Sequence, residues 1–459
     1  MSQAGAEHSV RGGPQDPQGL FSGLRRIREA ARRDKRVRFS ALLHHVTVEL
    51  LAASYRKLNP KATPGVDGMT WSAYGEKLEE KLKDLHERVH RGRYRAKPTR
   101  RSYIPKEGGE ERPLGIAALE DKIVQQATVW ILEQIYEEAF QGFSYGFRPG
   151  RHPHKALDAL YMGIKVKKIN WVLDADIRKF FDSVRHNWMA QFVEHRIADR
   201  RVQRLIQKWL RAGVSEDGEW SRTTVGTPQG AVISPLLANI YLHYVLDLWV
   251  KKWRNEQAHG DMVIVRYADD VVFGFQYEND ARAFHEALAK RFDEFGLVLN
   301  EQKTRLIEFG RYAAERRAAQ GKGKPETFDF LGFTHISGRS RNNGRFILMR
   351  RTSAKRWRAK LKEIRQTLLW HRHKPVPEQG RWLRSVLQGY YNYHAIPGNN
   401  RALQRMRMET ARAWMHALRR RSQRGRRLNW EWMKQVVAKW LPPVHIIHPY
   451  PDQRFGVRT

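Results

Sequence analysis

Hydrophobic and polar positions alternate along this chain with two different periods. Apolar residues recur at helical spacing over 38–58, from about 73 to 91 and over 120–140, and each stretch predicts an amphipathic helix. The segment 101–116 has the pattern of a strand, a Gly-Gly turn and a second strand. Strand and helix patterns then alternate to about residue 345, which is typical of a mixed α/β domain.

The stretch "MVIVRYADDVVFGF" (262–275) places two adjacent acids, Asp269 and Asp270, between apolar runs that predict buried strands. Neighbouring carboxylates repel each other and are unfavourable to bury without a positive partner. The stretch alone therefore leaves two interpretations open. It is either a hairpin turn whose aspartates point into water, or a site for a divalent metal ion.

A second acidic stretch, "NWVLDADIRKFFDSV" (170–184), predicts a strand over 171–177. Because strand side chains alternate between two faces, Asp174 and Asp176 share a face with Val172. The opposite face would pack on a core and carries Trp171, Leu173, Ala175 and Ile177. Taken alone, this stretch favours a solvated edge strand somewhat over a metal site or a catalytic pair.

The segment "VGTPQGAVISPLLANIYLHYVLDLW" (225–249) predicts a Gly/Pro loop followed by a helix, with Ser234 as N-cap and Pro235 at the first helical position. Glycine in such a loop lets backbone approach a ligand closely. Helical spacing places one apolar face on Leu236, Leu237, Ile240, Tyr241, Tyr244, Val245 and Leu248. Further along, 294–309 predicts a turn and a short strand, and 326–335 predicts another short strand.

The net charge of the chain indicates which class of molecule it binds. The 459 residues carry a net charge of +36, and the commonest partner of so large a positive field is a polyphosphate backbone. Residues 351–459 hold 25 Lys and Arg against five Asp and Glu, together with seven Trp, and predict basic helices that bind RNA or DNA. Most of these Trp are expected in a helical core. Residues 1–34, rich in Gly, Gln and Arg, predict a disordered tail.

Several function classes are excluded by composition. We find no run near 18 apolar residues, no lipidation signal and no secretory leader, so a membrane role is not expected. Cysteine is absent, which excludes disulfides and thiolate zinc sites and fits a reducing cytosol.

The order and spacing of the motifs resemble the reverse transcriptase block of bacterial group II intron-encoded proteins. The similarity runs from about residue 38 to the C-terminus. "ATPGVDGMTW" resembles the extra N-terminal motif of that family, and "LQGYYNYHAIPG" with the following basic helices resembles its thumb and maturase domain. The block itself is carried by "RPLGI", "FSYGFRPGR", "DADIRKFFD", "TPQGAVISPLLANIYL", "RYADD", "GLVLNEQKT" and "FDFLGF".

This resemblance implies the α/β (α+β) fold of a right-hand polymerase. We expect fingers over 35–165, a palm with an antiparallel catalytic sheet over 166–345, and an all-α basic thumb and maturase domain over 346–459. Two Mg²⁺ ions are expected at Asp176, Asp269 and Asp270, with Ile177 also among the metal ligands. Consecutive strand residues face opposite ways, so Asp269 and Asp270 can both approach metal only at the tip of a hairpin.

Roles for other residues follow from the same resemblance. Lys106 and Arg112 match residues that grip the incoming triphosphate, although a solvated basic hairpin is the plain alternative. Phe180 matches the aromatic that blocks a ribose 2′-hydroxyl, Gln229 is expected near nucleotide or template, and Lys303 matches a proposed proton donor to pyrophosphate. Asp174 and Asp182 are expected to be structural acids.

The resemblance implies an RNA-directed DNA polymerase that binds its group II intron RNA, assists splicing and copies the intron during retrohoming. Its partners would be the intron RNA, target and primer DNA and deoxynucleoside triphosphates, in the cytoplasm or nucleoid of a bacterium, with a homodimer possible. Many relatives carry a Cys- and His-bearing DNA endonuclease domain, and target cleavage is not expected without cysteine. Two alternatives stay open: a splicing-only maturase, and a stand-alone reverse transcriptase in phage defence or DNA repair.

Overall fold

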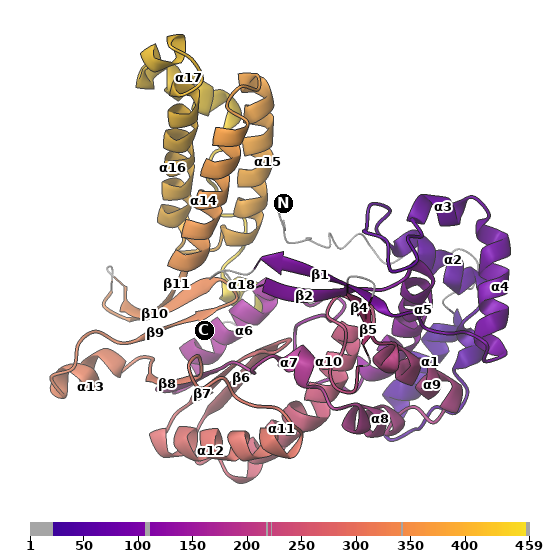
Figure 1. The fold of residues 1–459 in the computed structure, drawn as a ribbon. Coiled ribbons are helices and arrows are strands. Elements are labelled where there is room, and N and C mark those ends of the chain that lie inside the picture. The colour runs from indigo at the N-terminus through magenta and orange to yellow at the C-terminus, as the bar shows by residue number, and fades with distance from the viewer. Residues whose placement is uncertain (1–21, 106–110, 217–218, 222, 341–342, 456–459) are drawn as a thin grey trace.

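The computed structural model describes residues 22–105, 111–216, 219–221, 223–340 and 343–455. Figure 1 shows three parts: a helical N-terminal part at the right, a central sheet with its helices below, and a helical bundle of the C-terminal residues at the top. The largest hydrophobic core joins the first two parts, and the bundle has a core of its own.

The N-terminal part packs around one long buried helix. Helix α5 (Leu119–Tyr136) buries most of its length and contacts α1 and α2. Around it lie α1 (Ser22–Arg33), η1 (Leu43–His45), α2 (Val48–Lys57), α3 (Trp71–Gly75), α4 (Leu78–His90), α8 (His186–Glu194) and α9 (Arg200–Arg211). A sheet of order β2-β1-β4-β5 adjoins them, built from β1 (Thr99–Pro105), β2 (Glu111–Ile116), β4 (Val214–Glu216) and β5 (Glu219–Ser221).

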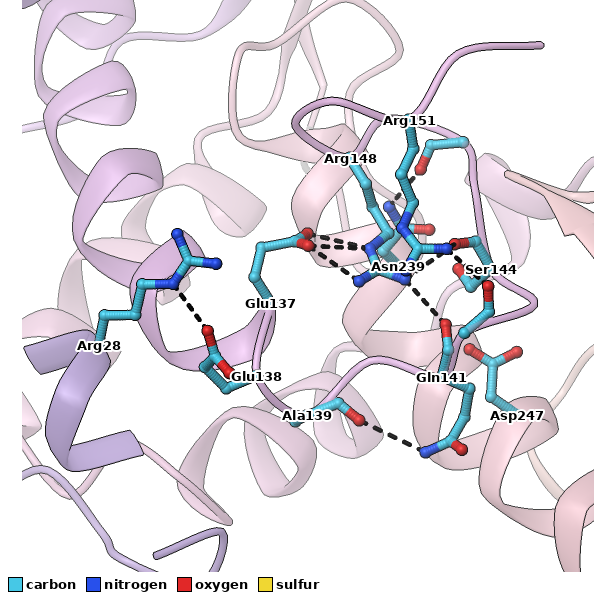
Figure 2. Close-up of polar contacts among 12 residues, drawn as sticks. Arg28, Glu137, Glu138, Ala139, Gln141, Ser144, Arg148, Arg151, Asn239 and Asp247 are labelled. Atoms are coloured by element: carbon cyan, nitrogen blue, oxygen red, sulfur yellow. Dashed lines mark hydrogen bonds and ion pairs between the residues drawn. The ribbon is translucent and has the colours of Figure 1, made fainter. Parts of the chain in front are cut away.

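The expectation of disorder up to residue 34 is wrong for Ser22–Arg33, which form α1. Leu24, Ile27 and Ala31 lie on one face of this helix and are buried. On its exposed side, Arg28 Nε donates to Glu138 Oε1 at 2.7 Å, as Figure 2 shows. A narrow apolar stripe among six charged residues gives a low average hydrophobicity, and that average concealed the helix.

The central sheet has the order β6-β7-β3-β8 and is antiparallel throughout. It comprises β3 (Trp171–Ala175), β6 (Met262–Tyr267), β7 (Asp270–Phe275) and β8 (Arg305–Glu308). Helices α10 (Ser234–Leu242), α11 (Leu248–Glu256) and α12 (Glu278–Glu294) belong to the core on one face, and α6 (Pro153–Val166) packs on the other. The solvated edge-strand interpretation of 171–177 is therefore wrong, because β3 lies between β7 and β8 with both faces covered.

The C-terminal bundle follows a small sheet of order β11-β10-β9, made of β9 (Thr327–Phe330), β10 (Phe333–Arg339) and β11 (Phe346–Thr352). The bundle consists of α14 (Ala354–Trp370), α15 (Val376–His394), α16 (Asn400–Arg419) and α17 (Trp430–Trp440). Trp414 is fully buried in it, whereas Trp370 is 81% exposed. The last helix, α18 (Pro451–Phe455), returns to α6, where Arg454 Nε lies 3.2 Å from Asp158 Oδ2.

The remaining short elements are α7 (Phe180–Ser183), the π-helical turn η2 (His243–Asp247), α13 (Ala313–Ala319) and η3 (Arg424–Arg427). Among the helices of the described residues, none combines the length and the apolar character that crossing a bilayer requires.

Candidate active site

A two-residue turn joins β6 to β7 and presents the paired acids. Tyr267 pairs with Asp270 across the hairpin, so Ala268 and Asp269 form the turn between them. Ala268 has φ of 57°, the left-handed region that glycine favours, and any other residue there is strained. The expected hairpin is present, and its tip carries both acids as the resemblance requires.

Asp176 follows directly after β3, the strand that pairs with β7. Its Oδ2 accepts a hydrogen bond from Asn300 Nδ2 at 3.0 Å and lies 3.3 Å from Lys303 Nζ. The Asp176 carbonyl also accepts from the Asn300 N–H at 2.8 Å. The segment after α12 therefore holds Asp176 by main chain and side chain. Asn300 was not singled out from sequence, although it lies within the "GLVLNEQKT" motif.

Asp176 lies close enough to Asp269 and Asp270 for its charge to act on both. Burial raises the pKa of Asp269, and the Asp176 charge adds to that effect. Burial raises the pKa of Asp270 to about 6, and the charges of Asp269 and Asp176 add to it. Asp270 keeps exposed surface, but it lies where surrounding protein limits its hydration. A cluster of this kind favours a nearby positive charge.

Positive side chains approach this cluster from three elements. Arg112 of β2 lowers the pKa of Asp269, and Arg356 of α14 and Lys303 lower that of Asp270. An open pocket of about 480 Å³ lies beside the acids. Its lining includes Asp174, Asp176, Asp270, Lys303, Arg305 and Asp329.

Ile177 is buried at 4% exposure, so only its main chain could reach a ligand. Ile177 forms a β-bridge with Leu299, and the two hydrogen bonds of that bridge are made by the Asp176 carbonyl and the Arg178 N–H. The Ile177 carbonyl takes part in neither of these two bonds. Asp174 sits opposite Arg305 across β3 and β8, and burial raises its pKa to about 7 despite that arginine.

The loop that carries Gln229 lies against β2. The Gln229 carbonyl accepts from the Gly115 N–H at 2.6 Å, and a side chain at Gly230 would lie 3.1 Å from the Gly115 carbonyl. The predicted N-cap is wrong by one residue: Ile233 is the N-cap of α10, and Ser234 is its first residue. The Ser234 hydroxyl donates to the Pro228 carbonyl at 2.9 Å and does not cap the helix. Gln229 is thus held beside the strand that carries Arg112, whereas Lys106 lies outside the described residues.

The assignment of Phe180 as the ribose-contacting aromatic does not fit its surroundings. Phe180 is 2% exposed, and its ring packs against Phe181 at 5.4 Å and Tyr241 at 6.4 Å between centroids. It belongs to the core under α7 and would have to leave that core to touch a nucleotide. Phe181 is partly exposed, and its carbonyl accepts from the Thr227 N–H at 2.8 Å.

The loop that includes "FSYGFRPGR" is held by the polar contacts of Arg148, which Figure 2 shows. Arg148 is buried and forms an ion pair with Glu137, with Nε to Oε1 at 3.0 Å and Nη2 to Oε2 at 2.9 Å. Its Nη1 donates to the carbonyls of Gln141 and Ser144. These bonds fix the loop from both of its ends.

The same loop touches the turn of the hairpin. The Tyr145 N–H donates to the Arg266 carbonyl at 2.8 Å, and a side chain at Gly146 would lie 2.2 Å from the Ala268 nitrogen. Only glycine permits this approach. The motif therefore has a structural explanation that its sequence alone did not give.

Comparison with known proteins identifies the family. The family model described as "Reverse transcriptase (RNA-dependent DNA polymerase)" matches residues 104–335. The chain belongs to the reverse transcriptase family. This domain spans the central sheet, the paired acids and β2, so the expected right-hand polymerase fold with its mixed α/β content and antiparallel sheets is confirmed. The boundaries of fingers, palm and thumb stay predictions.

Individual relatives of this reverse transcriptase include intron proteins. It is 36% identical to Protein YkfC of Escherichia coli (strain K12) over 282 residues, 54% of this chain and 74% of YkfC. It is 34% identical to group II intron-encoded protein LtrA of Lactococcus lactis subsp. cremoris over 249 residues, 51% of this chain and 41% of LtrA. Nuclear intron maturase 1, mitochondrial, of Arabidopsis thaliana is 28% identical over 92 residues, 20% of this chain and 13% of that protein. The chain thus spans less than half of the two named intron proteins, and the predicted kinship with group II intron-encoded proteins is confirmed.

Proposed function

We propose that this protein is an RNA-directed DNA polymerase of the group II intron type, which synthesises DNA at the tip of the β6–β7 hairpin. The observation that carries the proposal is the convergence of Asp176, Asp269 and Asp270 from two neighbouring strands, where the Asp176 charge helps to raise the pKa of the other two. Three acids gathered beside an open pocket suit cation-assisted phosphoryl transfer, in which the protein mainly positions and neutralises charge.

The donor set fits Mg²⁺, which prefers hard oxygen ligands. Within the part of the chain that the structure describes, no three Asp, Glu or His side chains are grouped so as to hold an ion by themselves. Mg²⁺ usually keeps water and substrate phosphates in its shell and takes only one or two carboxylates. Asp176, Asp269 and Asp270 would hold two ions, with the Ile177 carbonyl as a further donor. The chemistry that bound Mg²⁺ supplies is activation of the primer hydroxyl and stabilisation of the departing pyrophosphate.

The chain's own groups divide the remaining work. Arg112, exposed on β2 and near enough to act on Asp269, would bind the triphosphate. Lys303 would act as a general acid and donate a proton to the departing pyrophosphate. Gln229 would contact the nucleotide or the template beside β2. Phe181, partly exposed where Phe180 is buried, would meet the ribose 2′ position and favour deoxynucleotides.

We further propose that the same protein binds a group II intron RNA and assists its splicing. The C-terminal bundle supports this role, because residues 351–459 carry five basic residues for each acidic one. The similarity to group II intron-encoded protein LtrA and to nuclear intron maturase 1 supports the same role. Intron RNA, target DNA and deoxynucleoside triphosphates are the proposed partners.

Primer extension on an RNA template with Mg²⁺ tests the polymerase, with Asp269→Asn as the matched variant. We expect extension by the wild type, none by Asp269→Asn, and equal RNA affinity for both in filter binding. Loss of RNA binding in step with extension would contradict a separate catalytic site. No extension by either protein, with tight RNA binding kept, would replace the proposal with a splicing-only maturase, and an intron splicing assay would then decide.

A further inference from the structure

We propose that Arg266, Asp247 and Asn239 are positioning residues for catalysis. They form a buried polar network that holds the Ala268 carbonyl and thereby fixes the turn that presents Asp269 and Asp270. The inference rests on the proposed function in one respect: it takes these two acids as the metal-binding pair.

Arg266 is the last buried residue of β6 and is the centre of the network. Its side chain and that of Asp247 are both 0% exposed. Nε donates to Asp247 Oδ1 at 2.7 Å and Nη2 donates to Oδ2 at 2.6 Å, a bidentate pair. The remaining nitrogen, Nη1, donates to Asn239 Oδ1 at 3.0 Å and to the Ala268 carbonyl at 2.9 Å.

The network reaches the turn from a second side through Asn239. Its Nδ2 donates to the Gly146 carbonyl at 2.8 Å, and the Gly146 backbone packs directly against the Ala268 nitrogen. Ala268 is therefore held at its carbonyl by Arg266 and pressed at its nitrogen by Gly146. These two constraints hold a non-glycine residue in the left-handed region, a conformation that surrounding structure must impose.

A local change of helix type brings the two partners of Arg266 together. Asn239 and Asp247 are eight residues apart, which would place them about 80° apart around a regular α-helix. The π-helical turn η2 (His243–Asp247) lies between them and adds a residue to one turn, which rotates Asp247 inward. Figure 2 shows Asn239 and Asp247 near the loop that carries Arg148.

Stability alone is a poor explanation for this arrangement. A buried ion pair loses the hydration of both charges, and apolar residues of equal volume often stabilise a core as well or better. What an apolar cluster cannot supply is a donor for the Ala268 carbonyl in a fixed direction. Four hydrogen bonds from one planar guanidinium set that direction, and lysine cannot reproduce them.

The consequence is functional because the held peptide lies between Ala268 and Asp269. If the carbonyl is released, Ala268 can leave its strained conformation, and the Asp269 carboxylate moves with the rotating peptide. Polar groups that orient metal ligands typically change metal affinity or activity about 10- to 100-fold when they are lost.

The test uses full-length Asn239→Ala and Arg266→Lys. Asn239→Ala leaves the Arg266–Asp247 pair intact and is the smaller change, so it keeps the proposal testable if Arg266→Lys fails to fold. Arg350→Lys is the control. Arg350 forms a similarly buried ion pair with Asp158, with Nη1 2.8 Å from Oδ1, and this pair does not contact the hairpin turn. We compare primer extension against Mg²⁺ and deoxynucleotide concentration, Mn²⁺ binding to free enzyme by EPR, and hydrogen exchange at residues 267–270.

For Asn239→Ala we expect kcat to fall and the Mg²⁺ requirement to rise, each about 10-fold or more. The deoxynucleotide KM should stay near its wild-type value, Mn²⁺ should bind more weakly, and residues 267–270 should exchange faster. Arg350→Lys should change thermal stability without changing these values. The proposal is overturned if Asn239→Ala and Arg266→Lys keep wild-type metal dependence, or if Arg350→Lys alters it equally.

The Mn²⁺ measurement separates this inference from the proposed function. If the wild type extends no primer, the polymerase proposal fails. The positioning network would still be supported if the wild type binds Mn²⁺, Asp269→Asn abolishes that binding and Asn239→Ala weakens it. If extension is normal and Asn239→Ala binds Mn²⁺ as the wild type does, the positioning role is refuted while the polymerase stands.

Discussion

Lys303 places its ammonium group 3.3 Å from the Asp176 carboxylate, on the same oxygen that accepts a hydrogen bond from Asn300. The Lys303 side chain is 58% exposed, and exposed ion pairs add little to stability. We therefore expect Lys303 to contribute to catalysis and not to stability. We predict that Lys303→Ala lowers kcat about 100-fold, a typical effect of losing a general acid. Single-nucleotide incorporation by rapid quench measures it.

Two further variants show whether Lys303 gives a proton or only a charge. Lys303→Arg keeps the charge but cannot release a proton near neutral pH, so its kcat should also fall. Lys290→Ala removes an exposed lysine from α12 and should leave kcat unchanged. Full activity of Lys303→Arg would show that charge alone is needed.

Phe180 and Phe181 are adjacent but lie in different environments, and that difference predicts opposite outcomes. Phe181→Ala should reduce the preference for deoxynucleotides over ribonucleotides by about 10- to 200-fold, the range for losing a small steric contact. Phe180→Ala should leave that preference unchanged and destabilise the fold by about 3 kcal/mol, because it empties a core position. Competition between the two nucleotide types, with urea unfolding alongside, distinguishes the residues. A loss of discrimination in Phe180→Ala alone would restore the original assignment.

Sequence periodicity predicted the strands and helices correctly where the local backbone geometry is regular. The apolar runs around Asp269 and Asp270 predicted two buried strands, and these are β6 and β7. The helix predicted over 120–140 is α5. Placing the acids together needed the motif order of a family, because pairing between β3 and β7 joins residues about 100 positions apart, and no local pattern encodes it.

The helix after the "TPQG" loop shows where periodicity fails. A regular helix places Leu248 on the buried face, but the π-helical turn η2 shifts the register by one residue. Leu248 is consequently 40% exposed, and Asp247 is fully buried. A composition average likewise missed α1, and position within the motif favoured Phe180 over Phe181. For Leu248 and for the two phenylalanines, a one-residue shift decided which side chain meets the core.

Asp174 gives a pH-dependent prediction for stability. Burial raises its pKa to about 7 in the folded chain, against an ordinary value of 3.8. The folded state thus binds the proton more tightly, so Asp174 lowers the stability of the fold as pH rises from 3.8 to about 7, and that loss is complete above the folded pKa. Asp174→Asn should therefore raise Tm at pH 8 and leave it nearly unchanged at pH 4. Calorimetry at the two pH values measures it.

Asp182→Asn, which changes an exposed acid on α7, is the matched control and should leave Tm near the wild-type value at both pH values. Primer extension by Asp174→Asn should persist, as expected of a structural acid. Abolished extension would instead place Asp174 among the catalytic residues, and a Tm gain of equal size at both pH values would mean that its charge is not the cause.

A groove on the C-terminal bundle leads to a prediction about RNA binding. It measures about 540 Å³, and its lining includes Trp357, Arg358, Lys362, Arg365 and Arg405. Arg405 lies over the Trp357 ring at 4.9 Å, and Arg358 and Lys362 are exposed along α14. A basic groove with an aromatic wall suits a phosphate backbone with unpaired bases.

Each neutralised phosphate contributes about −0.7 to −0.9 to the slope of log affinity against log salt. The double variant Arg358→Ala with Lys362→Ala should therefore make that slope about 1 to 2 units less steep, which fluorescence anisotropy with an RNA probe at several salt concentrations measures. Lys251→Ala with Lys290→Ala removes the same charge from α11 and α12, away from the groove, and should leave the slope near its wild-type value. Equal slopes for both double variants would mean that RNA responds to the overall field of the protein and not to this groove.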